Sequence, residues 1–295
     1  MFRNYIKIAL RNLIKFKAFS FINIIGLAIG IASCILVILF IVDEFNYDTH
    51  YPNSENIYRI HLKAKLNERE MEIAQSCAPL ASTLMREVPE VKFATMMQPT
   101  SNMLITYENK TYIEKNFYWA DSVFFDVFTT NFIRGEKKNA LTAPHSLVIS
   151  KTAAKKYFGS ENPIGKMMKF EDGTPYRVMA VVEDCKPNSH FHYDFVASFS
   201  SRNDGTERNW GQNYIYTYAL LNPNSNIERF ESNLMGLVEK YVGPEFQNAF
   251  KMSFEEIIQA GNYYIYYAMP LTKIHLYSHV VGELEGNGFK RTIPF

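Results

Sequence analysis

The feature that most constrains this chain is an uncharged apolar run near its N-terminus. Residues 18–42 contain no charged side chain, and Phe19–Val42 reads FSFINIIGLAIGIASCILVILFIV. At about 1.5 Å per residue this run spans roughly 36 Å, which is enough to cross a hydrocarbon core of about 30 Å. The run therefore predicts one membrane-spanning helix at residues 18–42.

Charges on either side of the run predict its orientation. Residues 1–17 carry five bases and no acid, whereas Asp43, Glu44 and Asp48 follow the run. Positive charge is typical of the cytoplasmic flank of a membrane helix. We therefore expect a single-pass membrane protein with a cytoplasmic N-terminus and the bulk of the chain outside the cytoplasm.

Two other N-terminal signals compete with a permanent anchor. A cleaved signal peptide has a shorter apolar stretch and a small-x-small cleavage site, and the sequence FIVDEFNYD at the end of the run offers no such site. The residues Ile31–Cys34 resemble a lipoprotein cleavage motif, but cleavage before Cys34 leaves ILVILFIV where a polar tether is expected. Both comparisons favour an uncleaved anchor.

The first 17 residues predict a basic amphipathic helix on the inner membrane surface. Four bases recur every four residues and form one stripe on a helix: Arg3, Lys7, Arg11 and Lys15. Apolar side chains form the opposing face, among them Ile6, Leu10, Leu13 and Ile14. Such a helix lies along the interface and contacts membrane lipids. The alternative is a simple positive flank.

Two glycines inside the apolar run predict contact with a partner helix. Gly26 and Gly30 form a G-x-x-x-G pattern, and small residues let a second membrane helix approach closely. Glycine is also common in membrane helices that have no such contact. We expect this helix to pack against partner helices.

The body predicts an α+β fold of two strand–helix–strand units that bracket a β-rich insert. In the first unit, Ile57–Lys65 alternates and reads as a half-buried strand with Arg59 and His61 on its outer face. Ser225 and Glu228 predict a capping box in the second unit. The expected units are Ile57–Lys65, Pro79–Val88 and Val91–Met97, then Tyr214–Leu221, a helix through Tyr241, and Tyr263–Met269.

Turn signals mark the insert. Ser150 is expected to cap a short helix that Gly159 ends, and Asp172-Gly173 predicts a hairpin. The polar stretch Ser200–Gly211 reads as a loop or a subdomain connection.

No motif predicts catalysis or a cofactor. Gly159–Lys166 has five residues between its glycines where a phosphate-binding loop has four, and Met167 replaces the metal-binding hydroxyl. No nucleophile elbow or zinc-protease motif is present. Outside residues 1–17, the chain has 26 basic and 30 acidic residues, which argues against nucleic-acid binding. The sequence therefore predicts a protein that is not an enzyme.

Candidate metal ligands are few. His190, His192 and Asp194 alternate and would share one face of a strand, but the flanking aromatics favour a buried face of their own, with the polar face in solvent. We therefore expect no metal site. The spacing of Cys77 and Cys185 leaves open whether they pair.

Three blocks of sequence resemble MacB/FtsX-type ABC-transporter permeases. Residues 5–60 look like the family's amphipathic helix, SFINIxGL membrane segment and acidic-aromatic exit. Leu147–Phe195 resembles the central motif of the MacB-like periplasmic core domain, and Pro270–Ser278 resembles its closing strand. The resemblance implies a porter-like subdomain, in the two parts 43–102 and 200–295, and a sabre-like insert at 103–199.

The resemblance also implies a function. Such a permease subunit would lie in the bacterial inner (cell) membrane with the bulk of the chain in the periplasm, and its partner helices would be further transmembrane helices of a permease or a second permease copy. It would work with a cytoplasmic ABC ATPase and couple ATP hydrolysis to export or to mechanical movement of the periplasmic domain. The family has further membrane helices after the core domain, so we expect this chain to be an N-terminal fragment or a truncated product. The alternative function is a single-pass, membrane-tethered ligand-binding or sensor module.

Overall fold

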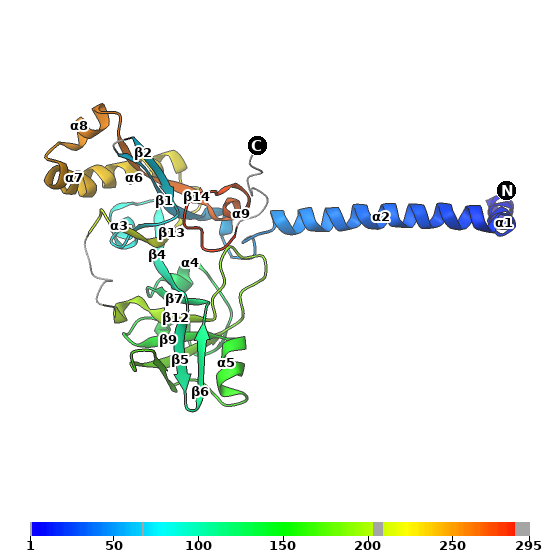
Figure 1. The fold of residues 1–295 in the computed structure, drawn as a ribbon, viewed down its shortest axis with the longest axis horizontal. Coiled ribbons are helices and arrows are strands. Elements are labelled where there is room, and N and C mark those ends of the chain that lie inside the picture. The colour runs from blue at the N-terminus through cyan, green and yellow to red at the C-terminus, as the bar shows by residue number, and fades with distance from the viewer. Residues whose placement is uncertain (1, 67, 203–208, 287–295) are drawn as a thin grey trace. The chain divides into compact units, whose positions relative to one another are not determined.

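The computed structural model describes residues 2–66, 68–202 and 209–286, which form two compact units. Unit 1 is Met1–Asn46 and unit 2 is Tyr47–Phe295. Figure 1 shows both as ribbons, with unit 1 in blue.

The described part of unit 1 contains two helices that meet at Phe16. Helix α1 spans Phe2–Lys15 and helix α2 spans Lys17–Phe45. With 29 residues, α2 is about 44 Å long. Among the described residues, it is the one helix long and apolar enough to cross a membrane. It continues three residues past the expected end at Val42.

Unit 2 is built on a four-stranded antiparallel sheet with the strand order β14-β1-β13-β4. The strands are β1 (Ile57–Leu66), β4 (Val91–Thr100), β13 (Asn213–Leu221) and β14 (Tyr263–Pro270). Helix α3 (Leu80–Glu87) connects β1 to β4, and α6 (Ile227–Leu237) follows β13. This order and connectivity are those of a split βαβ, or ferredoxin-like, unit.

Both helices cover one face of this sheet. Leu84 of α3 and Phe230 and Leu234 of α6 are fully buried against Ile60 and Leu62 of β1. Beyond α6 the chain continues as a π-helical turn (Val238–Val242), then as α7 (Gly243–Phe250) and α8 (Phe254–Gln259). Two short strands, β2 (Arg69–Ile73) and β3 (Ser76–Cys77), pair with β1 and β13.

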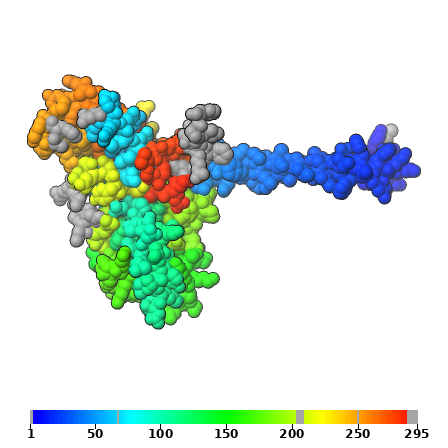
Figure 2. Space-filling model, in the orientation of Figure 1, coloured from blue at the N-terminus to red at the C-terminus, as the bar shows by residue number. Residues whose placement is uncertain are grey.

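The β-rich insert lies between β4 and β13 in the chain. Its strands follow the order β7-β12-β9-β11-β10-β5-β6, and β8 pairs with β11. Its elements are β5 (Met103–Tyr107), β6 (Lys110–Glu114), β7 (Phe117–Ala120), α4 (Phe124–Val127), β8 (Phe132–Arg134), β9 (Ser146–Ser150), α5 (Lys151–Phe158), β10 (Met167–Phe170), β11 (Pro175–Val182) and β12 (Phe195–Ser198). Within unit 2, Figure 2 shows the insert in green as a separate lobe.

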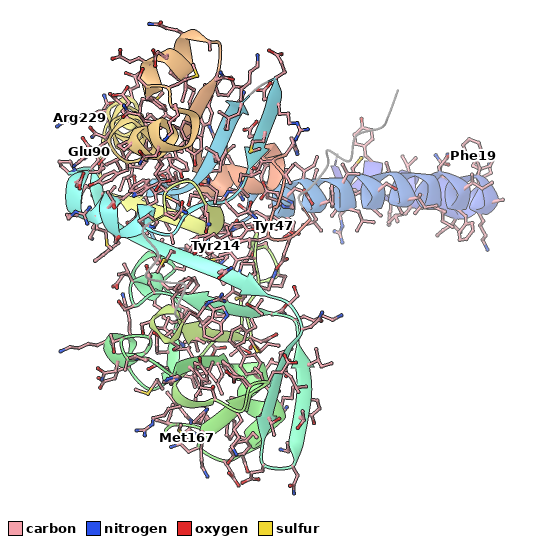
Figure 3. The ribbon with its side chains drawn as sticks, turned by 60° about the vertical axis from the view of Figure 1, so that its left-hand side comes forward. Phe19, Tyr47, Glu90, Met167, Tyr214 and Arg229 are labelled. Atoms are coloured by element: carbon pink, nitrogen blue, oxygen red, sulfur yellow. The ribbon has the colours of Figure 1, made fainter. Side chains whose placement is uncertain are left out.

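One strand joins the two lobes of unit 2. The first part of β4 pairs with β13, and its last four residues, Met97–Thr100, pair with β7 of the insert. Met97 faces Tyr216 on one side and Ala120 on the other. The backbone hydrogen bonds therefore continue through a single 14-stranded sheet, and β4 is seen crossing between the lobes in Figure 3.

Short helical turns complete unit 2. The described part of unit 2 has 3₁₀ turns at Ser54–Asn56, Lys137–Asn139, Phe199–Ser201 and Leu271–Lys273. The last of these leads into α9 (Ile274–Tyr277).

The predicted α+β class, the two strand–helix–strand units and the β-rich insert are confirmed. Ser150 caps α5 by accepting a hydrogen bond from the Ala153 backbone N–H, and Gly159, with φ of +62°, ends the helix. The hairpin at Asp172-Gly173 is present, with Gly173 at φ +79°. Residues 203–208 of the predicted loop Ser200–Gly211 lie outside the described part of the chain.

Two local predictions were wrong. The N-cap of α6 is Asn226, whose side chain accepts from the Arg229 N–H, whereas Ser225 donates to the carbonyl of Asn222. Asn226 is the cap because it directly precedes the first helical residue, Ile227, and has the extended backbone of an N-cap residue. In β1, Arg59 and His61 are buried, not solvent-facing. Their face of the sheet is covered by a second hydrophobic core, to which α4 contributes.

Candidate functional site

The sequence-predicted site residues all lie in unit 1. Arg3, Lys7, Arg11 and Lys15 are exposed on α1, and so are the apolar side chains Ile6, Leu10, Leu13 and Ile14. An α-helical α1 gives the bases one stripe because residues four apart lie on the same side. That these bases contact lipid remains a prediction.

Gly26 and Gly30 lie on an open side of α2. A Cβ built on either glycine meets no neighbouring heavy atom within 4 Å in the described structure. The two glycines are four residues apart and so stand about one turn from each other on one helix face. Their proposed role in packing against a partner helix stays a prediction.

Sequence reasoning missed a second candidate site, a buried polar cluster in unit 2. We call it the junction cluster and define it by its five main residues, which come from five separate segments: Asp48, Arg59, His190, Tyr218 and Glu283. All except Glu283 are at most 3 % exposed. Buried charges are costly unless they are paired, so this cluster constrains how its segments meet.

One end of the junction cluster fixes the segment that follows α2. Asp48 is fully buried and takes a positive φ of 59°. Its Oδ1 accepts the His190 backbone N–H, and its Oδ2 lies 3.0 Å from His190 Nδ1. The Asp48 N–H donates to the carbonyl of Asn188 at 2.9 Å. The start of unit 2 is thereby held against the segment that returns from the insert.

The cluster continues from His190 to the sheet. His190 Nε2 lies 2.7 Å from the Tyr218 hydroxyl on β13. Arg59 on β1 donates to both carboxylate oxygens of Glu283, at 2.5 and 2.8 Å, and to Ser278 Oγ at 2.7 Å. Ser278 also donates to Glu283. The arrangement is bidentate, which is the strongest geometry for an arginine–carboxylate pair.

Pairing keeps both partners ionised despite their burial. Burial opposes the charge on Arg59, but the hydrogen bonds and charge of Glu283, together with the contact to Tyr218, outweigh it and raise the pKa of Arg59. Burial likewise opposes ionisation of Glu283, and the hydrogen bonds and charge of Arg59 lower the pKa of that carboxyl. Burial raises the pKa of the Tyr218 hydroxyl well above its usual range.

The C-terminal segment is attached at three further points. Val281 forms a parallel bridge with Ile73, and the Gly282 carbonyl accepts a 2.5 Å hydrogen bond from the Tyr216 hydroxyl. His192 Nδ1 lies 2.9 Å from both carboxylate oxygens of Glu285. The first residues of unit 2 and the last described ones are thus joined through side chains on β1 and β13.

The histidines predicted to face solvent are divided between two environments. His190 is 3 % exposed and belongs to the junction cluster, so its predicted solvent-facing position was wrong. His192 bonds Glu285, whereas Asp194 accepts from Ser150 and Asn116. The described residues hold no group of three or more His, Cys, Asp or Glu side chains positioned to bind a metal.

The two body cysteines are free thiols. Cys77 packs in the core beneath α3 and α6, whereas Cys185 packs against the core around α4. Burial raises the pKa of each thiol to about 12. Neither is a reactive thiolate at neutral pH.

In this chain a split βαβ unit with a β-rich insert follows one candidate membrane-spanning helix. The chain belongs to the MacB-like periplasmic core domain family, which it matches over residues 20–237. This confirms the family expected from the sequence. The family consists of permease domains and is not a catalytic one.

One solved structure supports the fold, and two others are more distantly similar. A domain of a protein described as a permease from Porphyromonas gingivalis is 22% identical, with a TM-score of 0.63 over 75% of this chain and 91% of that one. The periplasmic region of MacB from Actinobacillus actinomycetemcomitans is 16% identical (TM-score 0.48; 75% and 91% covered). The extracellular domain of the noncanonic ABC-type transporter YknZ from Gram-positive bacteria is also 16% identical (TM-score 0.44; 72% and 100% covered). No curated protein sequence matched the chain.

The first prediction concerns the buried ion pair. Arg59→Met leaves Glu283 buried without its counter-charge, so we expect a loss of about 3–5 kcal/mol in the free energy of unfolding. The double variant Arg59→Met/Glu283→Gln should be more stable than Arg59→Met alone, because no unpaired charge remains. Urea unfolding of the full chain in detergent, followed by tryptophan fluorescence, measures both. Additive losses in the double variant would contradict the coupling.

Lys63→Met is the matched control on the same strand. Lys63 pairs with Glu70 at 3.5 Å, and both side chains are substantially exposed. Exposed pairs contribute about 0–1 kcal/mol, so this variant should unfold close to the wild type.

The second prediction concerns pH. The hydrogen bond to Glu285 raises the pKa of His192. The stabilisation that this pair gives the fold is therefore complete below about pH 6.5, the pKa of an unfolded histidine, and is lost as the pH rises through the higher pKa of the folded state. Burial opposes ionisation of Glu285, but His192 lowers the pKa of this carboxyl, so its share is lost as the solution becomes acidic. His192→Gln should therefore destabilise the chain more at pH 5.5 than at pH 8.5. Urea unfolding at the two values tests this, and an equal loss at both would refute it.

Proposed function

We propose that this chain is a permease subunit, or the N-terminal part of one, of an ABC transporter of the MacB/FtsX type. A partner ATPase in the cytoplasm hydrolyses ATP, and the chain couples that hydrolysis to export or to mechanical movement of the periplasmic domain. Membership of the MacB-like periplasmic core domain family supports this proposal most directly.

The junction cluster gives this proposal a physical basis. It connects Asp48, three residues after α2 ends, to Glu283 near the end of the described chain. A permease of this type must pass force between its membrane helices and its outer domain. Buried, paired charges resist separation, so the cluster suits a fixed connection between the segments that lead toward the membrane.

The proposed topology follows the charges. Residues 1–17 lie in the cytoplasm, residues 18–42 cross the bacterial inner membrane, and the rest is periplasmic. The proposed porter-like subdomain comprises residues 43–102 and 200–295, and the sabre-like subdomain comprises 103–199. Gly26 and Gly30 contact a neighbouring permease helix, and the bases of α1 hold anionic lipid headgroups.

Co-purification tests the transporter assignment. Tagged full chain, isolated from native membranes in mild detergent, should carry an ABC ATPase subunit and show ATP hydrolysis. Gly26→Leu/Gly30→Leu should lower the recovery of partner membrane segments, because the added bulk separates the helix backbones. Ala28→Leu, about 200° around the helix from Gly26, is the matched control. Absence of any ATPase, or equal recovery in all variants, would count against the respective proposal.

Charge reversal on α1 tests its role at the membrane. Each base near an anionic surface contributes about 1 kcal/mol, so Lys7→Glu/Arg11→Glu should weaken attachment of α1 and impair coupling or insertion. The fold of unit 2 should remain intact, as judged by circular dichroism. Protease accessibility of the N-terminus and stimulated ATP hydrolysis are the measurements. Unchanged topology and coupling would refute a role for the stripe.

A further inference from the structure

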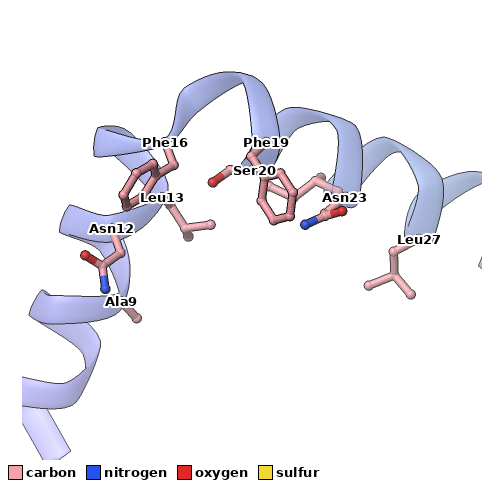
Figure 4. A pocket seen from close by; sticks show the side chains of 9 residues that line it. Ala9, Asn12, Leu13, Phe16, Phe19, Ser20, Asn23 and Leu27 are labelled. Carbon is pink, nitrogen blue, oxygen red and sulfur yellow. The ribbon is translucent and has the colours of Figure 1, made fainter.

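The inner side of the bend between α1 and α2 forms an apolar groove within unit 1 (Figure 4). We call it the elbow groove; it has a volume of about 800 Å³. Its lining comes from both helices: Ala9, Asn12, Leu13 and Phe16, then Phe19, Ser20, Asn23, Ile24 and Leu27. We propose that the elbow groove is a binding site for one anionic phospholipid of the cytoplasmic leaflet.

The depth of the groove matches one leaflet. On α2 it runs from Phe19 to Leu27, which is about 12 Å along the helix axis. Half of a hydrocarbon core is about 15 Å thick. An acyl chain of the cytoplasmic leaflet ends near the bilayer centre, as the groove does. A neighbouring transmembrane helix would instead continue along α2 into the other leaflet.

The chemistry of the groove also fits a lipid. Its walls are almost wholly apolar, and they include the rings of Phe16 and Phe19. Three uncharged polar side chains, Asn12, Ser20 and Asn23, interrupt this surface. Amide and hydroxyl groups can hydrogen-bond the glycerol ester oxygens of a phospholipid, which lie between its headgroup and its acyl chains.

Charge at the bend selects the headgroup. The Lys15 ammonium lies 5.6 Å from the centre of the Phe16 ring, and Phe16 lines the groove. Lys17 begins α2 on the other side of the bend. No acidic residue occurs before Asp43. A phosphate at the bend therefore meets positive charge only, and a headgroup with net negative charge is favoured over a zwitterionic one.

Native mass spectrometry of the full chain in detergent tests the site, with phosphatidylglycerol and phosphatidylcholine as probes. The wild type should retain one phosphatidylglycerol, about fivefold more readily than phosphatidylcholine. Lys15→Gln/Lys17→Gln should abolish this preference and leave phosphatidylcholine retention unchanged. Leu27→Trp should fill the groove and reduce retention of both lipids at least threefold. Leu13→Trp fills the same groove from α1 and guards against a folding defect in one variant.

Ile25→Trp is the control, since Ile25 is exposed at a similar depth but about 200° around α2 from Leu27. It should behave as the wild type. Equal losses in Leu27→Trp and Ile25→Trp, or no preference for phosphatidylglycerol in the wild type, would overturn the proposal. So would a Ser20→Cys variant that forms disulfide cross-links to a second membrane polypeptide, because a helix would then occupy the groove.

The inference rests on the proposed membrane position of α2 but not on the ATPase partner. Alkaline carbonate extraction separates the two kinds of failure. Chain released into the soluble fraction would defeat the anchor and the lipid site together. Membrane-retained chain without groove-dependent lipid retention would defeat the lipid site alone, and chain that binds lipid without an ABC ATPase would defeat the transporter assignment alone.

Discussion

The fully buried guanidinium of Arg59 sets a condition that much of unit 2 has to meet. A cation without access to water needs a counter-charge and further acceptors, and Glu283 and Ser278 supply them. Both residues come from the end of the described chain: Ser278 is 219 residues from Arg59, and Glu283 is 224. The ion pair thus draws the C-terminal segment onto the first strand of the sheet. Tyr218, His190 and Asp48 extend the same network to the segment after α2.

Buried charge of this kind contributes more to specificity than to net stability. A well-packed apolar replacement of an ion pair is often neutral, whereas removal of one partner is costly. The junction cluster therefore penalises any arrangement in which the segments that contribute its residues separate. In the proposed permease, such a penalty preserves the connection between the segment after α2, strand β1 and the C-terminal segment, while β4 and the continuous sheet connect the lobes.

Much of the architecture was predictable from the sequence. The apolar run, the strand alternation and the turn residues Ser150, Gly159 and Gly173 act locally, so their patterns survive in a single sequence. The junction cluster was not predictable in this way. In a strand, a polar residue between apolar ones indicates a solvent-facing side, and for Arg59 the contacts of Glu283 and Ser278 in the C-terminal segment reverse that. A charged residue alternating with apolar ones gave no signal of its distant partner.

For the predicted site residues of unit 1, the sequence predicts the position on a helix but not the contacts. Periodicity placed the bases and glycines on helices, and the contacts proposed for them are with molecules other than this chain. The elbow groove had no signal in the sequence, because it depends on the bend at Phe16 and on residues from both helices. The cap of α6 shows a smaller uncertainty, since Ser225 and Asn226 are both good capping residues and the backbone geometry decides between them.

The position of the insert also governs the order in which the domain can be completed. Strand β1 needs β13 and β14 as its neighbours, yet the whole insert separates β1 from both in the chain. When the polypeptide is synthesised from its N-terminus, β1, α3 and β4 are made first and their apolar faces stay uncovered until β13 and β14 follow. The strands of the insert are contiguous in the chain and can pair with one another before that. The insert can therefore fold first, and closure of the sheet around β1 is a late step of high contact order. During that interval the exposed strands are the part of the molecule most prone to misassociation, and a chaperone would find its substrate there.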